Sequence, residues 1–200
     1  MNQTELIDNI QQLGYCVIDD FLAATDYQAL QQMIQEKLQE QAFKPAGIGH
    51  KHHRNQDIRT DSLLWLDKET SNDAMLAYFS KLDQLLLLLN QTLYLGLVDY
   101  EAHFAVYEPH QFYKKHIDQF AHQKERRISS VYYLNESWQK EFGGELQLYD
   151  RDDRELTNIM PIGNRFVFFE SDLPHEVSIA YQRRYSLAAW LKVRPLASFR

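Results

Sequence analysis

Apolar residues recur at helical spacing in the first half of the chain, and short β-rich runs replace them in the second half. Helices are predicted over about residues 4–13, 24–41 and 72–93, because apolar side chains return there every three or four positions and form one stripe. The longest apolar run, Leu85–Leu89, is far shorter than a membrane span, so it predicts a buried helix face.

Strand-like runs dominate after the third predicted helix. They lie over about residues 98–107, 112–117, 127–135, 144–149, 165–169, 175–179 and 185–193, with earlier strands at 15–18 and 57–67. Helices first and strands after them favour an α+β fold, a double-stranded β-helix (jelly roll) whose N-terminal helices buttress one sheet. We expect a single domain, in which residues 1–97 supply helical support and a finger region and residues 98–200 form the jelly-roll core.

The composition is that of a globular protein, with 44% hydrophobic and 24% charged residues among 200. A net charge of −7 argues against a surface dedicated to nucleic acid, although the end of the chain after Glu176 is basic. Cys16 is the single cysteine and cannot form an intrachain disulfide, and the N-terminal residues lack a signal pattern. We therefore expect a cytoplasmic protein with neither a membrane nor a nucleic acid as partner.

Three residues are candidate metal ligands. His116 and Asp118 are two positions apart in a predicted strand, so their side chains project to the same face. A His-x-acid triplet arises about once by chance in such a composition, so the triplet alone is weak evidence for a metal site. A second histidine on a neighbouring predicted strand, His175, would complete a set of three ligands. Two histidines and one carboxylate on one side of a metal leave the other side open, which suits non-haem Fe(II) that activates O2.

An arginine follows His175 nine positions later, on the next predicted strand. Arg184 would place a fixed cation beside the metal, as a dicarboxylate cosubstrate requires. The 2-oxo acid end of such a molecule chelates iron while its far carboxylate seeks a guanidinium fork. Alternation places the neighbouring Arg183 on the opposite face.

With these features the sequence resembles the Fe(II)/2-oxoglutarate-dependent oxygenases, and within them the prolyl 4-hydroxylase family, including the hydroxylases that modify hypoxia-inducible factor and their bacterial relatives. The resemblance extends from about Asn55 to Val193. It rests on several ordered blocks, which are Asp57–Asp61 with Trp65, Tyr113–Asp118, Tyr132–Asn135, Trp138, Gly143–Leu146 and His175–Trp190.

The resemblance implies a dioxygenase with Fe(II) as cofactor, 2-oxoglutarate and O2 as cosubstrates, and ascorbate as a stimulant. The iron would supply the chemistry, an oxidative decarboxylation of 2-oxoglutarate that drives hydroxylation of a C–H bond. A residue in a protein or peptide, most of all proline, is the expected target. Two alternatives are an oxygenase acting on a small metabolite or free amino acid, and a metal-binding jelly roll without turnover.

Further site residues follow from alternation and from the resemblance together. If Tyr133 faces inward, then Tyr132 points toward the helices, and the resemblance implies that Tyr133 binds the distal carboxylate beside Arg184. Trp190 shares a face with Arg184, and the resemblance carries this position to substrate contact, against the plainer interpretation of a core tryptophan. The expected apolar walls of the cosubstrate pocket are Tyr113, Leu146 and Val177.

The segment Ala42–Trp65 is expected to be a finger that gates the substrate channel. The resemblance implies that Arg59 and Asp61 help to shape this channel, and we expect Asp61 to pair with Arg126 at the base of the finger. The remaining histidines are interpreted as structural, surface or loop residues. They are His50, His52, His53, His103, His110 and His122.

Overall fold

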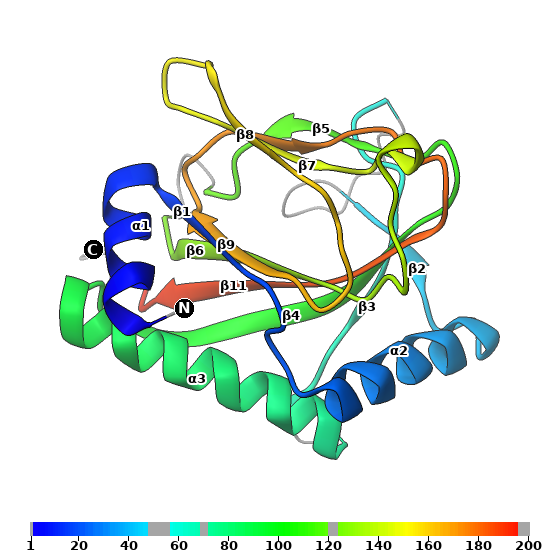
Figure 1. Cartoon of the computed structure of the whole chain (residues 1–200), viewed down its shortest axis with the longest axis horizontal. Helices are drawn as coiled ribbons and strands as arrows, with labels where there is room; N and C mark the ends of the chain where they lie inside the picture. The colour runs from blue at the N-terminus through cyan, green and yellow to red at the C-terminus, as the bar shows by residue number, and fades with distance from the viewer. Residues whose placement is uncertain (1, 48–56, 69–71, 120–123, 196–200) are drawn as a thin grey trace, which may run out of the picture.

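Two β-sheets face each other, and helices cover the outer side of the larger sheet in the computed structural model (Figure 1). The structure describes residues 2–47, 57–68, 72–119 and 124–195. Residues 48–56 of the predicted finger, which include His50, His52 and His53, lie outside these ranges, and so does His122. This arrangement confirms the predicted jelly roll with supporting helices.

Three helices begin and end close to their predicted positions. They are α1 (Gln3–Leu13), α2 (Ala24–Gln39) and α3 (Asp73–Leu93). A capping box between Asn2 and Glu5 starts α1, and Gly14 ends it at φ 78°, a left-handed conformation that glycine adopts without steric cost. Among the described residues, no helix is long and apolar enough to cross a membrane.

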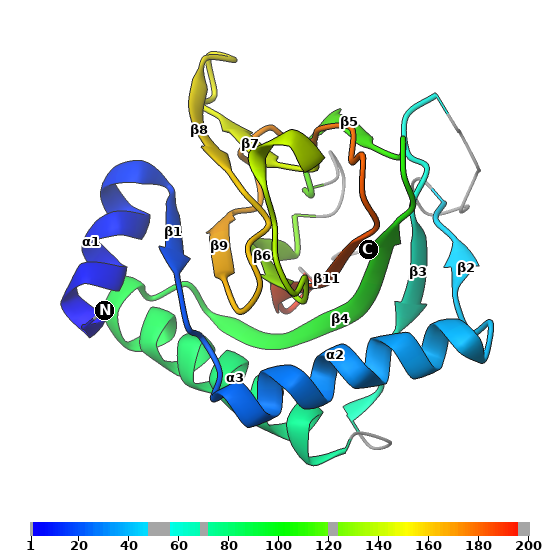
Figure 2. The same ribbon diagram turned by 45° about the vertical axis from the view of Figure 1, so that its right-hand side comes forward.

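The larger sheet has seven strands. In spatial order they are β1 (Tyr15–Ile18), β9 (Phe166–Glu170), β6 (Arg126–Tyr133), β11 (Arg184–Val193), β4 (Leu97–Tyr107), β3 (Ser62–Trp65) and β2 (Lys44–Pro45). The long strands β4 and β11 form its centre and curve beneath the smaller sheet (Figure 2). The smaller sheet contains β5 (Tyr113–His116), β10 (His175–Val177), β7 (Leu146–Tyr149) and β8 (Glu155–Ile159), in that order.

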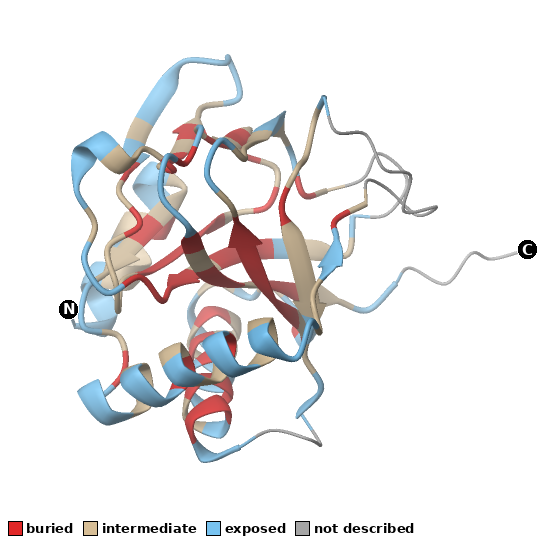
Figure 3. Cartoon of the chain, turned by 90° about the vertical axis from the view of Figure 1, so that its right-hand side faces the viewer, coloured by how far each residue is buried: buried red, intermediate tan, exposed pale blue. Residues whose placement is uncertain are grey.

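Alternation along the central strands divides the apolar side chains between two layers. One core lies between the helices and the large sheet and includes Tyr132, Phe166 and Leu187, whereas a second lies between the sheets and includes Tyr133, Val167 and Phe169. Figure 3 shows the buried residues concentrated in the central strands, with exposed residues on the outer side of α2. The predicted assignment of Tyr132 to the helical side and Tyr133 to the inner side is therefore confirmed.

The strand β8 was not predicted from the sequence. Its residues are mostly polar, and only Ile159 is buried. As the edge strand of the small sheet it is held by pairing with β7, from Leu146 opposite Ile159 onward. An exposed edge strand needs no apolar alternation on its solvent side, which is why its sequence gives little signal. Between β6 and β7 the chain also forms one 3-10 turn, Lys140–Phe142.

Candidate active site

Two histidines and one aspartate converge between the sheets. His116 ends β5 and lies directly opposite His175, the first residue of β10, while Asp118 follows two residues after His116. The Nε2 atoms of His116 and His175 lie 3.7 and 3.3 Å from the two carboxylate oxygens of Asp118. All three ligand atoms lie within 4.8 Å of one another, so one divalent cation can contact them together.

Neighbouring groups orient these three side chains. The Nδ1 atoms of His116 and His175 contact the carbonyl oxygens of Lys114 and Leu173 at 2.8 and 2.9 Å, which leaves each Nε2 facing the cluster. The Ser129 hydroxyl donates to Asp118 Oδ2 at 2.6 Å. Since Asp118 is buried, this hydrogen bond and the two imidazoles fix the direction of its carboxylate.

Burial and neighbouring charges hold His116 and Asp118 in the protonation states that bind a metal, whereas for His175 the Asp118 carboxylate outweighs burial and raises the pKa. Burial, and then the neighbouring His175, lower the pKa of His116 to about 3, so this imidazole is neutral and its Nε2 lone pair is available. Burial opposes ionisation of Asp118, but His175, His116 and Ser129 outweigh it and lower the pKa of the carboxyl below its usual range. Two imidazoles and one carboxylate with an open side fit the ligand set of non-haem Fe(II).

A buried arginine lies on the floor of the same cavity. Arg184 is 1% exposed, and its Nε donates to the Gly144 carbonyl at 2.8 Å while Nη1 donates to Ser186 Oγ at 3.1 Å. No carboxylate of a described residue lies within 4.0 Å of its guanidinium. Because burying a cation without a counter-ion is costly, this guanidinium is arranged for an anion that enters the cavity.

The hydroxyl of Tyr133 lies beside this cation. Its ring is completely buried 5.0 Å from the Arg184 guanidinium carbon, and its hydroxyl has no hydrogen-bond partner among the described residues. Gly144 permits the close packing here, since its φ is +69° and a Cβ would lie 3.0 Å from Arg184 Cδ. A carboxylate between Tyr133 and Arg184 would satisfy both donors.

The cavity between the arginine and the histidines has mostly apolar walls. The predicted wall residues Tyr113, Leu146 and Val177 all line it, and so does Trp190, which is 7% exposed. Alternation along β11 brings Arg184, Ser186, Ala188 and Trp190 to the cavity, as predicted. Arg183 instead pairs with Glu108 on the surface.

The predicted pairing of Asp61 with Arg126 is wrong. Asp61 accepts two hydrogen bonds from Arg59, and Arg126 pairs with Glu101 at 2.6 Å. The register of the large sheet explains this difference, because the start of β3 lies beside the C-terminal end of β4, whereas Glu101 lies towards the other end of that strand. Arg59 lines the cavity, while Asp61 is completely buried behind it.

Several residues that line the cavity were not predicted as site residues, among them His103 and Ser129. His103 and Trp190 line the cavity side by side, Trp65 packs against both of their rings, and Ser129 holds the ligand Asp118. Alternation does place His103 on one face with Ala105 and Tyr107, but it does not say which face of that strand meets the metal ligands. His110 lies exposed in a turn, in keeping with a surface role.

Comparisons with known proteins agree with this geometry. Residues 102–192 match the sequence model of the 2OG-Fe(II) oxygenase superfamily. The fold is similar to the crystal structure of a Pseudomonas putida prolyl-4-hydroxylase, with a TM-score of 0.86, 34% identity, and coverage of 96% of this chain and 100% of that chain. It is also similar to a Trichoplax adhaerens prolyl hydroxylase solved with a peptide fragment of hypoxia-inducible factor, with a TM-score of 0.86, 26% identity, and coverage of 95% and 88%.

Curated animal proteins match over most of this chain as well. The Caenorhabditis elegans hypoxia-inducible factor prolyl hydroxylase is 27% identical over 92% of this chain, and human Egl nine homolog 1 is 29% identical over 88%. These alignments cover 27% and 43% of the relatives' own lengths, so this chain spans less than half of each.

Proposed function

The chain belongs to the 2OG-Fe(II) oxygenase superfamily, with prolyl 4-hydroxylases among its relatives, and from this we propose that it uses Fe(II), 2-oxoglutarate and O2 to hydroxylate a proline residue in a protein. The observation that carries the proposal is the buried guanidinium of Arg184, which has no carboxylate partner among the described residues and shares one cavity with the His116, Asp118 and His175 cluster.

In this proposal His116, Asp118 and His175 hold the iron, and Arg184 with Tyr133 binds the distal carboxylate of 2-oxoglutarate. When bound, the iron supplies the oxidative chemistry, and the protein supplies orientation and a dry pocket. Tyr113, Leu146 and Val177 exclude water around the carbon chain of the cosubstrate. The charge of Arg184 and the hydroxyl of Tyr133 fix which end of the molecule faces the metal.

Trp190 and Arg59 are proposed to contact the substrate, because both line the cavity on its metal side. Asp61 would act through Arg59, since its carboxylate is completely buried and is occupied by that guanidinium. A protein substrate is supported by the relatives, one of which was solved with a peptide bound. Residues 1–200 would act as one domain, and a cytoplasmic location is part of the proposal, since the single thiol of Cys16 is buried and forms no disulfide.

The proposal is tested by three measurements. Purified protein with Fe(II) and 2-oxoglutarate should form succinate, and replacing Arg184 by lysine should lower the affinity for 2-oxoglutarate about tenfold, because lysine lacks the planar fork. The matched control R183K changes an exposed arginine on the opposite face and should leave the affinity unchanged. Mass spectrometry of host proteins with and without the enzyme should then find one added oxygen on proline.

If no succinate forms, the proposed enzyme activity is wrong, and the alternative of a metal-binding jelly roll without turnover takes its place. Oxidation of a free amino acid, with no modified protein, would replace the proposed substrate class by a small metabolite. Equal loss of affinity in R183K and R184K would move the carboxylate site away from Arg184.

A further inference from the structure

His103 is a buried polar residue that the proposed roles leave unused. It lies in β4 and lines the cavity, and the residue is 1% exposed. Its ring forms one cluster with two indoles, with centroid distances of 4.9 Å to Trp65, 5.1 Å to Trp190 and 6.1 Å between the indoles. Nδ1 is buried and has no hydrogen-bond partner among the described residues.

This environment is a poor one for a histidine with a purely structural role. A buried nitrogen without a partner destabilises a protein, whereas an apolar side chain of similar size would not. Burial, and then the positive charges of Arg59 and Arg126, lower the pKa of His103 well below its usual value. The neutral ring carries one N–H and one lone pair, and whichever of the two lies on Nδ1 has no partner among the described residues, so a group that enters the cavity is needed to satisfy it.

The strand register places His103 at the metal end of the cavity. His103 lies opposite Ala188 of β11, whereas Tyr107, four residues further along β4, lies opposite Arg184. Four strand residues correspond to about 13 Å, so the imidazole is remote from the site for the distal carboxylate. Trp190 lies opposite Ser129, the residue that hydrogen-bonds to the metal ligand Asp118.

The same register points His103 toward the substrate side. On its other flank it lies opposite Trp65 of β3, which is 49% exposed. The imidazole thus packs against Trp65, which is half exposed, and against Trp190, which lines the cavity together with it. A substrate chain that enters past Trp65 would meet His103 before its target carbon reaches the metal.

We propose that His103 is a specificity-determining residue, whose Nδ1–H donates a hydrogen bond to a main-chain carbonyl oxygen beside the target proline. This inference rests on the proposed function. Proline has no N–H, so the main chain next to it offers carbonyl oxygens as acceptors and no donor of its own. The ring of Trp190, which lines the cavity, would form an apolar wall for the pyrrolidine ring.

The test compares H103L, which removes the donor, with H103N, whose amide nitrogen replaces Nδ1. The probe is a library of synthetic peptides, each with one central proline, incubated with the full chain loaded with Fe(II) and 2-oxoglutarate. We expect kcat/KM for the peptides to fall about tenfold or more in H103L and to recover to within about threefold of wild type in H103N. H110N, at an exposed turn histidine, is the matched control and should match wild type.

Thermal denaturation separates this role from a structural one. Because leucine removes an unsatisfied buried nitrogen, H103L should melt at the same temperature as wild type or higher. A lower Tm in H103L, together with no recovery in H103N, would make His103 a structural residue and overturn the inference. Full peptide turnover in H103L would also overturn it while leaving the proposed function intact. If the wild type hydroxylates no peptide in the library, the proposed function fails for peptides and this inference falls with it.

Discussion

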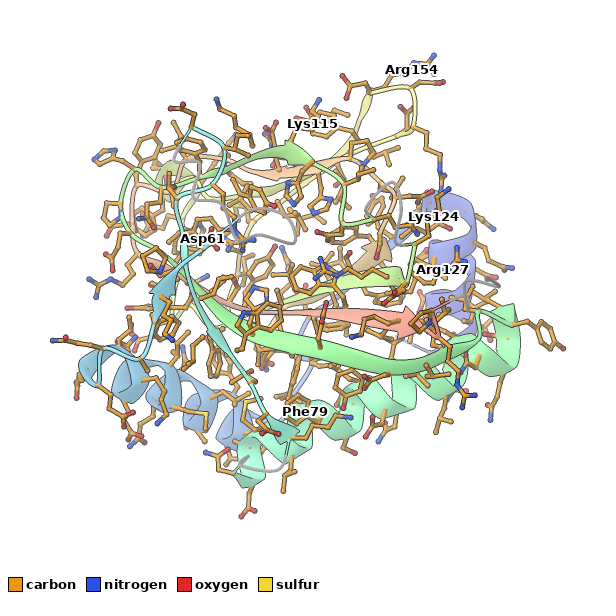
Figure 4. The ribbon with its side chains drawn as sticks, turned by 180° about the vertical axis from the view of Figure 1, so that it is seen from behind. Asp61, Phe79, Lys115, Lys124, Arg127 and Arg154 are labelled. Atoms are coloured by element: carbon orange, nitrogen blue, oxygen red, sulfur yellow. The ribbon has the colours of Figure 1, made fainter. Side chains whose placement is uncertain are left out.

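Asp61 accepts hydrogen bonds of 2.7 and 2.9 Å from Nε and Nη2 of Arg59, and the Arg59 guanidinium in turn lies 4.4 Å over the ring of Tyr113. Tyr113 stacks on the metal-ligand candidate His116 with a centroid distance of 3.6 Å and an angle of 16°. Figure 4 shows Asp61 at the level between the two sheets, whereas Phe79 lies on α3 at the helical side of the large sheet. A buried ion pair therefore supports the ring that packs on one metal ligand.

Replacing Asp61 by alanine should destabilise the protein strongly. Burial alone would lower the pKa of Arg59, but the Asp61 carboxylate outweighs it and raises the pKa, so the guanidinium stays charged. Without Asp61 a buried cation loses its partner, which costs about 3 kcal/mol or more and corresponds to a fall in Tm of roughly 6 °C or more. Thermal denaturation measures this. As a control, E108A removes an exposed ion pair with Arg183 and should change the free energy of unfolding by less than about 1 kcal/mol. Equal losses of stability in D61A and E108A would show that the buried Asp61–Arg59 pair contributes no more than an exposed pair.

Replacing Tyr133 by phenylalanine should weaken 2-oxoglutarate binding without loss of stability. The hydroxyl has no partner among the described residues, so its removal costs the cosubstrate-free protein nothing. A hydrogen bond to a carboxylate would be lost in the complex, and the Kd should rise about tenfold. Calorimetric titration measures this affinity.

The neighbouring Y132F provides the reciprocal control for Tyr133. The Tyr132 hydroxyl donates to Asn164 at 2.7 Å, on the helical side of the sheet. Y132F should therefore lower Tm and leave the Kd for 2-oxoglutarate unchanged. An unchanged Kd in Y133F would remove this tyrosine from the carboxylate site.

A divalent metal should stabilise the protein through Asp118. A ligand that binds only the folded state at a hundred times its Kd adds about 2.7 kcal/mol, so Mn²⁺ or Fe(II) should raise Tm clearly. D118A should lose this increase, since it removes one of three ligands. D153N, which changes an exposed carboxylate paired with Lys115, should keep the increase. Equal metal-induced shifts in both variants would place the metal elsewhere.

The ion pair between Asp19 and Arg165 should give a small pH-dependent contribution. A hydrogen bond from Arg165 lowers the pKa of Asp19 below its usual value of 3.8, so the folded state favours the carboxylate. This contribution is present above about pH 4 and is lost as pH falls through the lowered pKa. Because Asp19 is largely exposed, D19N should be less stable than wild type by less than about 1 kcal/mol at pH 7.

Urea denaturation at a series of pH values tests the sign of this effect. The difference between D19N and wild type should shrink as pH falls below about 4. A difference between D19N and wild type that grew at low pH would contradict the assignment.

Much of the site was predictable because it depends on short-range periodicity. Alternation separates Tyr133 from Tyr132 and Arg184 from Arg183. The two-residue spacing did single out His116 and Asp118, although β5 ends at His116, and the Ser129 hydroxyl and the two imidazoles orient the Asp118 carboxylate. The helices were predictable for the same reason, since the apolar stripe of α3 is a property of consecutive residues. The sequence resemblance added the cosubstrate and the class of reaction.

The remaining features depend on which strands become neighbours. Asp61 and Arg126 both suit an ion pair by charge, but the register of β3 on β4 places Asp61 beside Arg59 and away from Arg126. The polar strand β8 acquires its structure from β7. His103 becomes a cavity residue because β4 lies between β11 and β3, which brings it next to Ala188 and Trp65. Local periodicity in the sequence determined the faces of the strands, and only long-range pairing in the tertiary structure decided which faces and ends meet, because register is set by contacts between segments far apart in the chain.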